Sequence, residues 1–241
     1  MSTQVNRLGQ PIGFPVPNWR PRPRPPQDAI NGHFCRLEPF DADRHCADLF
    51  DAYAQDEDGR IWTYLPYGPF PSLPAFDDLM RAHFCGADPL CQIIIDRASG
   101  RAAGMASYMR IDPAVGSIEV GSIVYSPRLQ KRRAATEAMY LMMRRAFDEL
   151  GYRRYEWKCD ALNASSRQAA DRLGFRFEGI FRQAVVYKGR NRDTAWYSIL
   201  DREWPALKQA FERWLAPGNF DGEGCQRESL SKLTRTAAPS P

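Results

Sequence analysis

The stretch SIEVGSIVYSPRLQKRRAATEAMYLMMRRAFDEL, Ser117–Leu150, decides the fold class of this protein. Its opening part, Ser117–Tyr125, has the composition of a strand, and Ser126-Pro127 ends it. From Ala134 onward apolar residues return every three or four positions, which predicts a helix that Gly151 caps at its C-terminus. The side chains expected on the solvent face of this helix are Glu137, Arg144, Arg145 and Glu149.

The turn Gln130–Thr136, which joins this strand to this helix, is a candidate anion site. The first N–H groups of a helix have no partner inside the helix, and they lie at the positive end of the helix dipole. Pyrophosphate is a natural ligand for such a helix start. Lys131, Arg132 and Arg133 add positive charge at the same place, although a solvated basic turn is an alternative interpretation of these side chains.

Segments typical of strands and helices continue on both sides of this unit. Further strands are expected at His33–Glu38, Cys91–Asp96, Ala102–Arg110, Arg154–Cys159, Phe175–Phe181 and Thr194–Leu200. Further helices are expected at Asp43–Ala54, Pro74–Phe84, Ser165–Leu173 and Glu203–Leu215. Short turns at Ser99-Gly100 and Val115-Gly116 indicate antiparallel neighbours. We therefore predict a mixed α/β (α+β) fold, in which a twisted and mostly antiparallel sheet is flanked by helices.

The two ends of the chain differ in composition from the middle. Residues 1–30 hold seven prolines, several of them alternating with arginine, and such a run favours extended polyproline II. This arm is either a solvated leader or a strap across the folded domain, with Phe14 and Trp19 as anchors. The folded domain is expected to span residues 31–216. Residues 217–241 are rich in Gly, Ser, Glu and Pro and are predicted to be disordered.

The overall composition excludes several classes of protein. The formal net charge is only +4 and the basic residues cluster locally, so a nucleic-acid partner is not expected. No apolar run is long enough to cross a bilayer, and residues 1–10 carry no apolar signal core. A cytoplasmic protein without a membrane partner is therefore expected. Six cysteines form no C-x-x-C pair, so neither a metal site nor a disulfide framework is expected.

Several short motifs follow the strand, turn and helix in a fixed order. They are Ala135–Ala138, Asn163–Ser166, Leu173–Phe175, Glu178-Gly179 and Trp196–Leu200. In this order and spacing the sequence resembles the GNAT acetyltransferase superfamily, and within it the RimJ/RimL-like branch, over residues 34–205. The resemblance implies an N-acetyltransferase that uses acetyl-CoA as co-substrate. Its acceptor would be a primary amine, of a small molecule or a polypeptide N-terminus, attacking directly in a ternary complex, and a homodimer is left open.

One departure from the family concerns the turn. The superfamily's turn is usually rich in glycine, whereas Lys131 and Arg133 stand here where glycine is common. Glycine lets backbone approach a phosphate closely and tolerates unusual dihedral angles. The N–H groups stay available if the turn can be made with negative φ. The missing glycines also leave an alternative function open, that of a non-catalytic CoA-binding sensor or scaffold module.

The resemblance also assigns the residues that bind the co-substrate. The end of the strand is expected to pair with the pantetheine arm, and one of its backbone amides is expected to polarise the thioester carbonyl. The turn and the start of the helix are expected to bind the pyrophosphate. The residues implied are Ile123, Val124, Tyr125, Gln130, Lys131, Arg132, Arg133, Ala134, Ala135, Thr136, Asn163 and Ser166.

Two side chains are candidates for moving protons. Glu119, on the strand before the turn, is the candidate base for the amine, and its alternative role is that of an edge carboxylate that solvates the strand. By resemblance, Ser166 is the candidate acid that protonates the leaving thiolate. Its alternative role is to cap the helix, which Ser165 or Asn163 can also do.

The acceptor is expected near the aromatic loop Trp62–Phe70. A loop of this kind is either a wall of the substrate pocket or a plug on the core. Asp56–Asp58, just before it, would attract a cationic amine, or else form a solvated acidic loop. The residues alone leave both alternatives open.

Overall fold

An eight-stranded sheet forms the centre of the computed structural model, which describes residues 4–237. Its strands lie in the order β3-β4-β5-β6-β7-β8-β10-β9. They are β3 (Ile30–Asn31), β4 (Cys35–Pro39), β5 (Leu90–Asp96), β6 (Ala102–Asp112), β7 (Ser117–Tyr125), β8 (Arg154–Asp160), β9 (Arg176–Tyr187) and β10 (Arg190–Leu200). Among these neighbours β7 and β8 are parallel and the other pairs are antiparallel.

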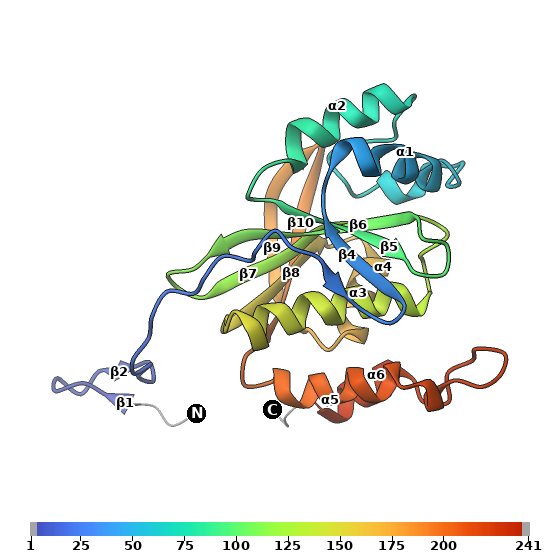
Figure 1. Ribbon diagram of the computed structural model, residues 1–241. Helices are drawn as coiled ribbons and strands as arrows, with labels where there is room; N and C mark the ends of the chain where they lie inside the picture. Colours follow the sequence, from blue (N-terminus) through green and yellow to red (C-terminus); the bar gives the residue numbers. More distant parts are fainter. Residues whose placement is uncertain (1–3, 238–241) are drawn as a thin grey trace.

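Helices cover both faces of this sheet (Figure 1). They are α1 (Ala42–Tyr53), α2 (Leu73–Phe84), α3 (Arg133–Arg144), α4 (Ala164–Arg172), α5 (Trp204–Leu215) and α6 (Leu230–Ala237), with the short turns η1 (Arg60–Trp62), η2 (Arg145–Glu149) and η3 (Pro217–Asn219). Helices α1 and α2 lie on one face, and α3, α5 and α6 lie on the other. The predicted fold class, a mixed α/β fold around a mostly antiparallel sheet, is confirmed.

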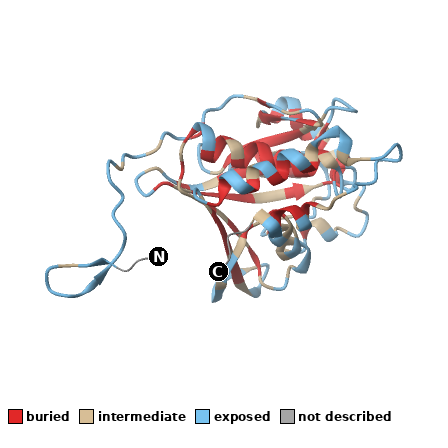
Figure 2. Ribbon diagram, turned by 90° about the horizontal axis from the view of Figure 1, so that it is seen from below, coloured by how far each residue is buried: buried red, intermediate tan, exposed pale blue. Residues whose placement is uncertain are grey.

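Alternating side chains of the sheet supply two cores. On β5, Cys91 and Ile93 pack with α1 and α2, whereas Leu90 and Ile94 pack with the layer that contains α3. This is the two-residue alternation of a strand that is covered on both faces. The buried residues accordingly run through the centre of the molecule, on the sheet and on the inner faces of the helices (Figure 2).

Strands β7 and β8 separate halfway along their length. They pair from Ser117 with Arg154 to Val120 with Trp157, and no further. Beyond that point β7 stays paired with β6, while β8 stays paired with β10. An extra residue in β7 opposite β6, with Ser122 at a φ of 47°, forms a β-bulge at the point of separation. The result is a wedge between two strands, which places backbone of β7 at an open edge.

Helix α3 differs from the sequence expectation in one respect. Two of the side chains expected to face solvent, Glu137 and Arg145, are each only 5% exposed. The Glu137 carboxylate accepts hydrogen bonds from three successive backbone N–H groups, those of residues 33–35. Arg145 pairs with Asp28 and with Glu149. The expectation was wrong for these two residues because Asp28 and residues 33–35, which contact them, come from the N-terminal segment, and helical periodicity does not report such contacts.

The N-terminal arm lies against the body over only part of its length. The Trp19 indole N–H donates to the carbonyl of Ala114 (2.7 Å), and its ring covers Gly116 so closely that a side chain there would clash. Arg24 donates to the carbonyl of Ala87 (3.1 Å). Phe14, the other expected anchor, is 52% exposed and does not hold the arm. Residues from Trp19 onward therefore form a strap, whereas the preceding residues extend away from the domain.

The C-terminal segment belongs to the folded body. The prediction of disorder from residue 217 does not hold for residues 217–237, because this stretch contains η3 and α6. Leu230 and Leu233 of α6 are buried in the same core as α3 and α5, and the Thr234 hydroxyl donates to the carbonyl of Arg172. The segment contains few apolar residues, but they pack into a core that overall composition cannot reveal. Residues 238–241 of the predicted tail lie outside the described residues.

Candidate active site

A single cavity of about 2160 Å³ opens where β7 and β8 separate. It is larger than the roughly 300–1,000 Å³ of an ordinary small-molecule pocket, which suits a long co-substrate together with an acceptor. Every site residue expected from the sequence lines this one cavity. These residues are Glu119, Ile123, Val124, Tyr125, Gln130, Lys131, Arg132, Arg133, Ala134, Ala135, Thr136, Asn163 and Ser166.

The start of α3 faces this cavity without a side-chain cap. By contrast, α1, α2 and α4 are capped by the side chains of Asp41, Ser72 and Asn163. An uncapped helix start leaves backbone N–H groups free to bind an anion at the positive end of the helix dipole. The start of α3 is therefore suited to a phosphate group.

The turn before α3 is tightened by backbone hydrogen bonds. The carbonyl of Ser126 accepts from the N–H groups of Leu129 and Gln130. Lys131 has a φ of 59°, so the turn is not made with negative φ throughout. A left-handed residue other than glycine costs about 1–2 kcal/mol, which explains why glycine is common here in the superfamily. The guanidinium of Arg133 lies between two aromatic rings, 4.8 Å from Phe34 and 4.4 Å from Phe220.

Arg172, at the end of α4, is a cavity residue that the sequence analysis missed. Its Nη1 donates to the Thr136 hydroxyl on α3 (3.1 Å), and its guanidinium lies 5.1 Å from the Trp214 ring. Burial lowers its pKa. Within residues 4–237 no carboxylate forms an ion pair with it. A partly buried cation without a carboxylate, close to a helix start, is suited to an anionic ligand.

Glu119 lies on β7 opposite Glu156 of β8, just before the two strands separate, and only 3% of it is exposed. Its Oε1 accepts from Arg110 Nη1 at 2.7 Å, and its Oε2 lies 2.9 Å from Lys158 Nζ. Lys158 is also 2.8 Å from Glu156 Oε2 and lies over the Trp196 ring. Because Glu119 is buried and paired, it does not act as an edge carboxylate that solvates the strand.

Ser166 does not cap α4, which was the alternative role considered for it. Asn163 caps α4, because its side-chain oxygen accepts from the backbone N–H of Ser166 (3.0 Å). The Ser166 hydroxyl oxygen accepts from the Trp157 indole N–H (3.0 Å) and lies beside the Cys159 thiol. Burial raises the pKa of Cys159, so this thiol stays protonated next to the hydroxyl.

Some residues of the aromatic loop plug the core, and others form part of the cavity wall. Trp62 is 5% exposed and packs edge-on against Tyr53 and Phe70, so it plugs the core. Tyr64 and the two residues after it line the cavity. The Tyr64 hydroxyl donates to the carbonyl of Leu162 (3.2 Å), which ties this loop to the turn before α4.

The acidic residues before this loop are engaged locally. The Asp56 carboxylate accepts from the backbone N–H of Ile61, and Asp58 pairs with Arg60. Elsewhere in the cavity lining, the Tyr187 hydroxyl donates to the Asp160 carboxylate (2.8 Å). Burial, together with this carboxylate, raises the pKa of Tyr187 to about 12. Tyr187 is therefore a neutral donor at physiological pH.

Among residues 4–237, no group of three or more His, Cys, Asp or Glu side chains is arranged to hold a metal ion. No helix of that same range is both long and apolar enough to span a bilayer. The six cysteines are free thiols, and Cys85 and Cys225 are the exposed ones.

Comparison with known proteins identifies relatives of the whole domain. The acetyltransferase (GNAT) domain family matches residues 35–176, more than half of the chain. A crystal structure of a GCN5-related N-acetyltransferase from Brucella melitensis is 50% identical, with a TM-score of 0.89, and covers 91% of this chain and 100% of that one. A Chromobacterium violaceum structure described as a GNAT-family acetyltransferase is 43% identical, with a TM-score of 0.76, over 82% of this chain and 98% of that one.

A curated relative matches over a shorter stretch. It is the Bacillus subtilis (strain 168) protein YdaF, whose name provisionally describes a ribosomal N-acetyltransferase. The two are 29% identical over 109 residues, which is 45% of this chain and 59% of that protein. The match thus spans less than two thirds of the relative's length.

Proposed function

The chain belongs to the GNAT acetyltransferase family, and we propose that it transfers an acetyl group from acetyl-CoA to a primary amine by direct attack in a ternary complex. One observation carries this proposal above the others. The uncapped start of α3, the wedge between β7 and β8 and the Glu119 carboxylate all open into the same cavity. An anion site, an open strand edge and a candidate base therefore meet in one place.

The donor end of the site would be built mainly from backbone. The free N–H groups at the start of α3 would hold the pyrophosphate, and Lys131 and Arg132 would add charge from the turn. Arg172 would supply a further phosphate contact, because it faces the same cavity and forms no ion pair with a carboxylate within residues 4–237. The open edge of β7 would pair with the pantetheine arm, as strand backbone without a neighbour does.

The acceptor end would work through Glu119. Arg110 is the exposed partner of this carboxylate, since 60% of its side chain is accessible. A protonated amine carries the same charge as Arg110 and would replace it at Oε1, where Glu119 takes the proton from the amine nitrogen. Lys158 would remain in place, held by Glu156 and Trp196.

The chemical step then needs a polarised carbonyl and an acid. Acetyl-CoA, when bound, supplies the acetyl group as a thioester. The bulged end of β7 would offer a backbone N–H to the carbonyl oxygen, and Ser166 would give a proton to the departing thiolate. The new bond is an amide and the broken bond is the thioester, so free CoA and one proton leave.

Two acceptor classes fit this site. The name of the Bacillus subtilis relative suggests a ribosomal protein, so a polypeptide N-terminus is one class, and a small-molecule amine is the other. In either case we propose a cytoplasmic enzyme, as the sequence composition predicts. The second candidate function is a CoA-binding sensor or scaffold, which is favoured by the pairing of both Glu119 oxygens with cations.

Turnover of acetyl-CoA separates these two functions. We expect the purified protein to release free CoA thiol when it is offered acetyl-CoA with a panel of small amines and N-terminal peptides. Calorimetric titration with CoA alone would run in parallel. Tight CoA binding without thiol release above the buffer rate, for every amine, would instead support the sensor or scaffold.

Arg172→Gln is expected to weaken CoA binding about tenfold, which corresponds to about 1.4 kcal/mol. The reason is the loss of a charged contact to phosphate. Arg167→Gln is the matched control, because Arg167 lies on the same helix and does not line the cavity. Calorimetry should show a higher dissociation constant for Arg172→Gln than for the control. Equal constants would assign Arg172 a purely structural role.

A further inference from the structure

The side chain of Arg133, the first residue of α3, lies between two aromatic rings. The carbon at the centre of its guanidinium is 4.8 Å from the centre of the Phe34 ring and 4.4 Å from that of Phe220. A guanidinium that packs on aromatic faces keeps its N–H groups at its edges, where they can form paired hydrogen bonds to a phosphate. The two rings therefore hold a phosphate-binding group in place and leave its donors available.

These donors are not occupied by an acidic side chain. None of the ion pairs within residues 4–237 involves Arg133. Arg133, Phe34 and Phe220 all line the large cavity. We call these three residues the arginine clamp. A fixed cation without a carboxylate, facing a cavity, is suited to an anionic ligand.

One ring of the arginine clamp comes from the C-terminal segment, beyond residues 35–176 that match the family. Phe220 begins a short loop, which a β-bridge between Phe220 and Gln226 closes. The side-chain amide of Asn219 donates to the carbonyl of Trp214 (3.0 Å), which ties this loop to α5. The Trp214 ring also packs edge-on against the Phe220 ring, with 5.3 Å between the ring centres. The C-terminal segment therefore sets the position of the ring that packs on Arg133.

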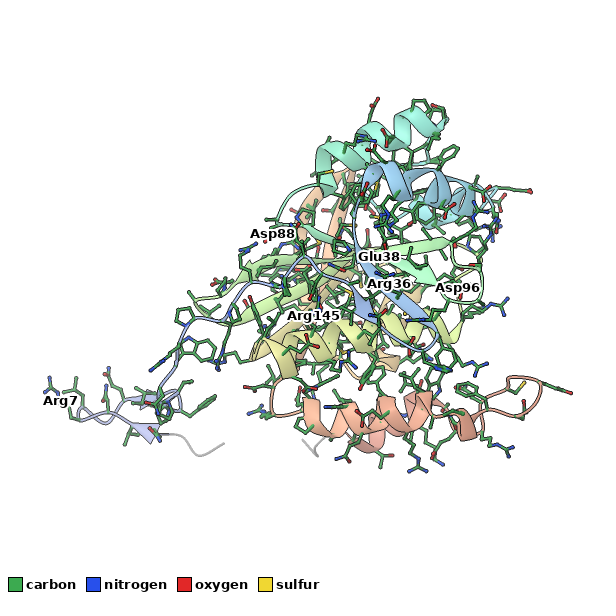
Figure 3. All side chains as sticks on the ribbon, viewed as in Figure 1. Arg7, Arg36, Glu38, Asp88, Asp96 and Arg145 are labelled. Carbon is green, nitrogen blue, oxygen red and sulfur yellow. The ribbon has the colours of Figure 1, made fainter. Side chains whose placement is uncertain are left out.

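The C-terminal loop lies at the end of the molecule where α3 begins. Figure 1 shows this loop, drawn in red, on the same side as the start of α3. In Figure 3 the labelled Asp96, another cavity residue, lies on this side, whereas the labelled Arg145 marks the other end of α3. The arginine clamp is therefore next to the helix start that is suited to pyrophosphate.

We propose that the arginine clamp binds the 3′-phosphate of CoA, so that the site distinguishes CoA from dephospho-CoA. Under the proposed function, on which this assignment rests, the pyrophosphate occupies the start of α3 together with Lys131, Arg132 and Arg172. CoA carries one further phosphate, on the 3′ position of its ribose. Because this ribose is attached to the pyrophosphate, its 3′-phosphate must lie close to the helix start. Arg133 supplies a fixed pair of donors there.

The same assignment accounts for a departure from the superfamily's turn. Arg133 stands where glycine is common, and a glycine has no side chain that could contact a phosphate. The Arg133 side chain extends to Phe34 and Phe220, and the start of α3 remains without a side-chain cap. The arginine would therefore add a phosphate contact while the backbone anion site is kept.

Calorimetric titration with CoA and with dephospho-CoA, which lacks only the 3′-phosphate, tests this assignment. The native chain should bind CoA about tenfold more tightly than dephospho-CoA. Arg133→Gln should weaken CoA binding about tenfold and leave dephospho-CoA binding unchanged, so that the preference disappears. Arg132→Gln is the matched control from the same turn. It should weaken both ligands alike and keep the preference, because both ligands carry the pyrophosphate.

Phe220 is a positioning residue in this assignment, and two variants test that role. Phe220→Leu keeps an apolar side chain but removes the aromatic face, and it should reduce the preference for CoA about threefold. Phe220→Tyr keeps the ring and should keep the preference. A purely structural role would instead make Phe220→Leu weaken both ligands in equal measure.

Several results would overturn the proposal. They are a native chain that binds CoA and dephospho-CoA equally, an Arg133→Gln chain that keeps the preference, and an Arg133→Gln chain that loses affinity for both ligands alike. Failure of the proposed reaction gives a different pattern. A chain that prefers CoA through Arg133 but releases no thiol from acetyl-CoA would be a sensor or scaffold with an intact arginine clamp.

Discussion

We expect Glu137→Ala to lower the free energy of unfolding by about 3 kcal/mol or more. The Glu137 carboxylate accepts from the backbone N–H groups of His33 (2.7 Å), Phe34 (2.6 Å) and Cys35 (2.8 Å). Three donors that converge on one buried carboxylate lose this partner together, and a cavity forms against Gly32. Urea denaturation followed by tryptophan fluorescence measures the loss.

Glu149→Ala is the control for this substitution. Glu149 lies further along the same helical segment, and 44% of its side chain is exposed beside Arg144 and Arg145. A surface ion pair of this kind contributes up to about 1 kcal/mol. If Glu137→Ala cost no more than Glu149→Ala, the three hydrogen bonds would not stabilise the junction between α3 and the N-terminal strands.

The position of Glu137 illustrates where prediction from the sequence succeeded and where it did not. Secondary structure was predictable because strand composition and helical spacing are local signals. The predicted strand Ser117–Tyr125 matches β7 residue for residue. The predicted helix from Ala134 to Leu150 corresponds to α3 and η2 together. Glu137 was wrongly predicted to face solvent, because its hydrogen-bond partners lie about a hundred residues earlier in the chain.

The prediction of disorder in the C-terminal segment was wrong for a related reason. Composition reports the average character of a segment, and residues 217–237 are mostly polar. Two leucines of α6 are nevertheless buried in the same core as α5. In the same way, the arm's real anchor, Trp19, could not be separated from Phe14 until the β6–β7 turn was in place beside it.

The candidate site was predicted through an ordered set of motifs, and all its residues line one cavity. The residues that were missed are the partners of the predicted ones. Arg110 and Lys158 come from the strands on either side of Glu119, and Arg172 reaches Thr136 from another helix. Pairs of this kind depend on strand order and helix packing, which a motif along the chain does not encode.

These missed partners shape the second large prediction. We expect Glu119→Gln to lower kcat about 10²–10³-fold, because an amide cannot take the proton of the attacking amine. The substitution keeps the size of the side chain and an oxygen for Arg110 or Lys158. CoA affinity should stay unchanged, since the phosphate contacts lie at α3. Steady-state kinetics with the best amine of the panel, and calorimetry with CoA, measure the two effects.

Glu156→Gln provides the decisive comparison. Glu156 contacts the same Lys158 ammonium, at 2.8 Å, but does not line the cavity. If Glu119 mattered only by neutralising Lys158, both substitutions would reduce kcat alike. If Glu119 is the base, Glu119→Gln alone should cause a large loss of kcat. Similar rates for both variants would remove Glu119 from proton transfer and leave the amine to lose its proton to water.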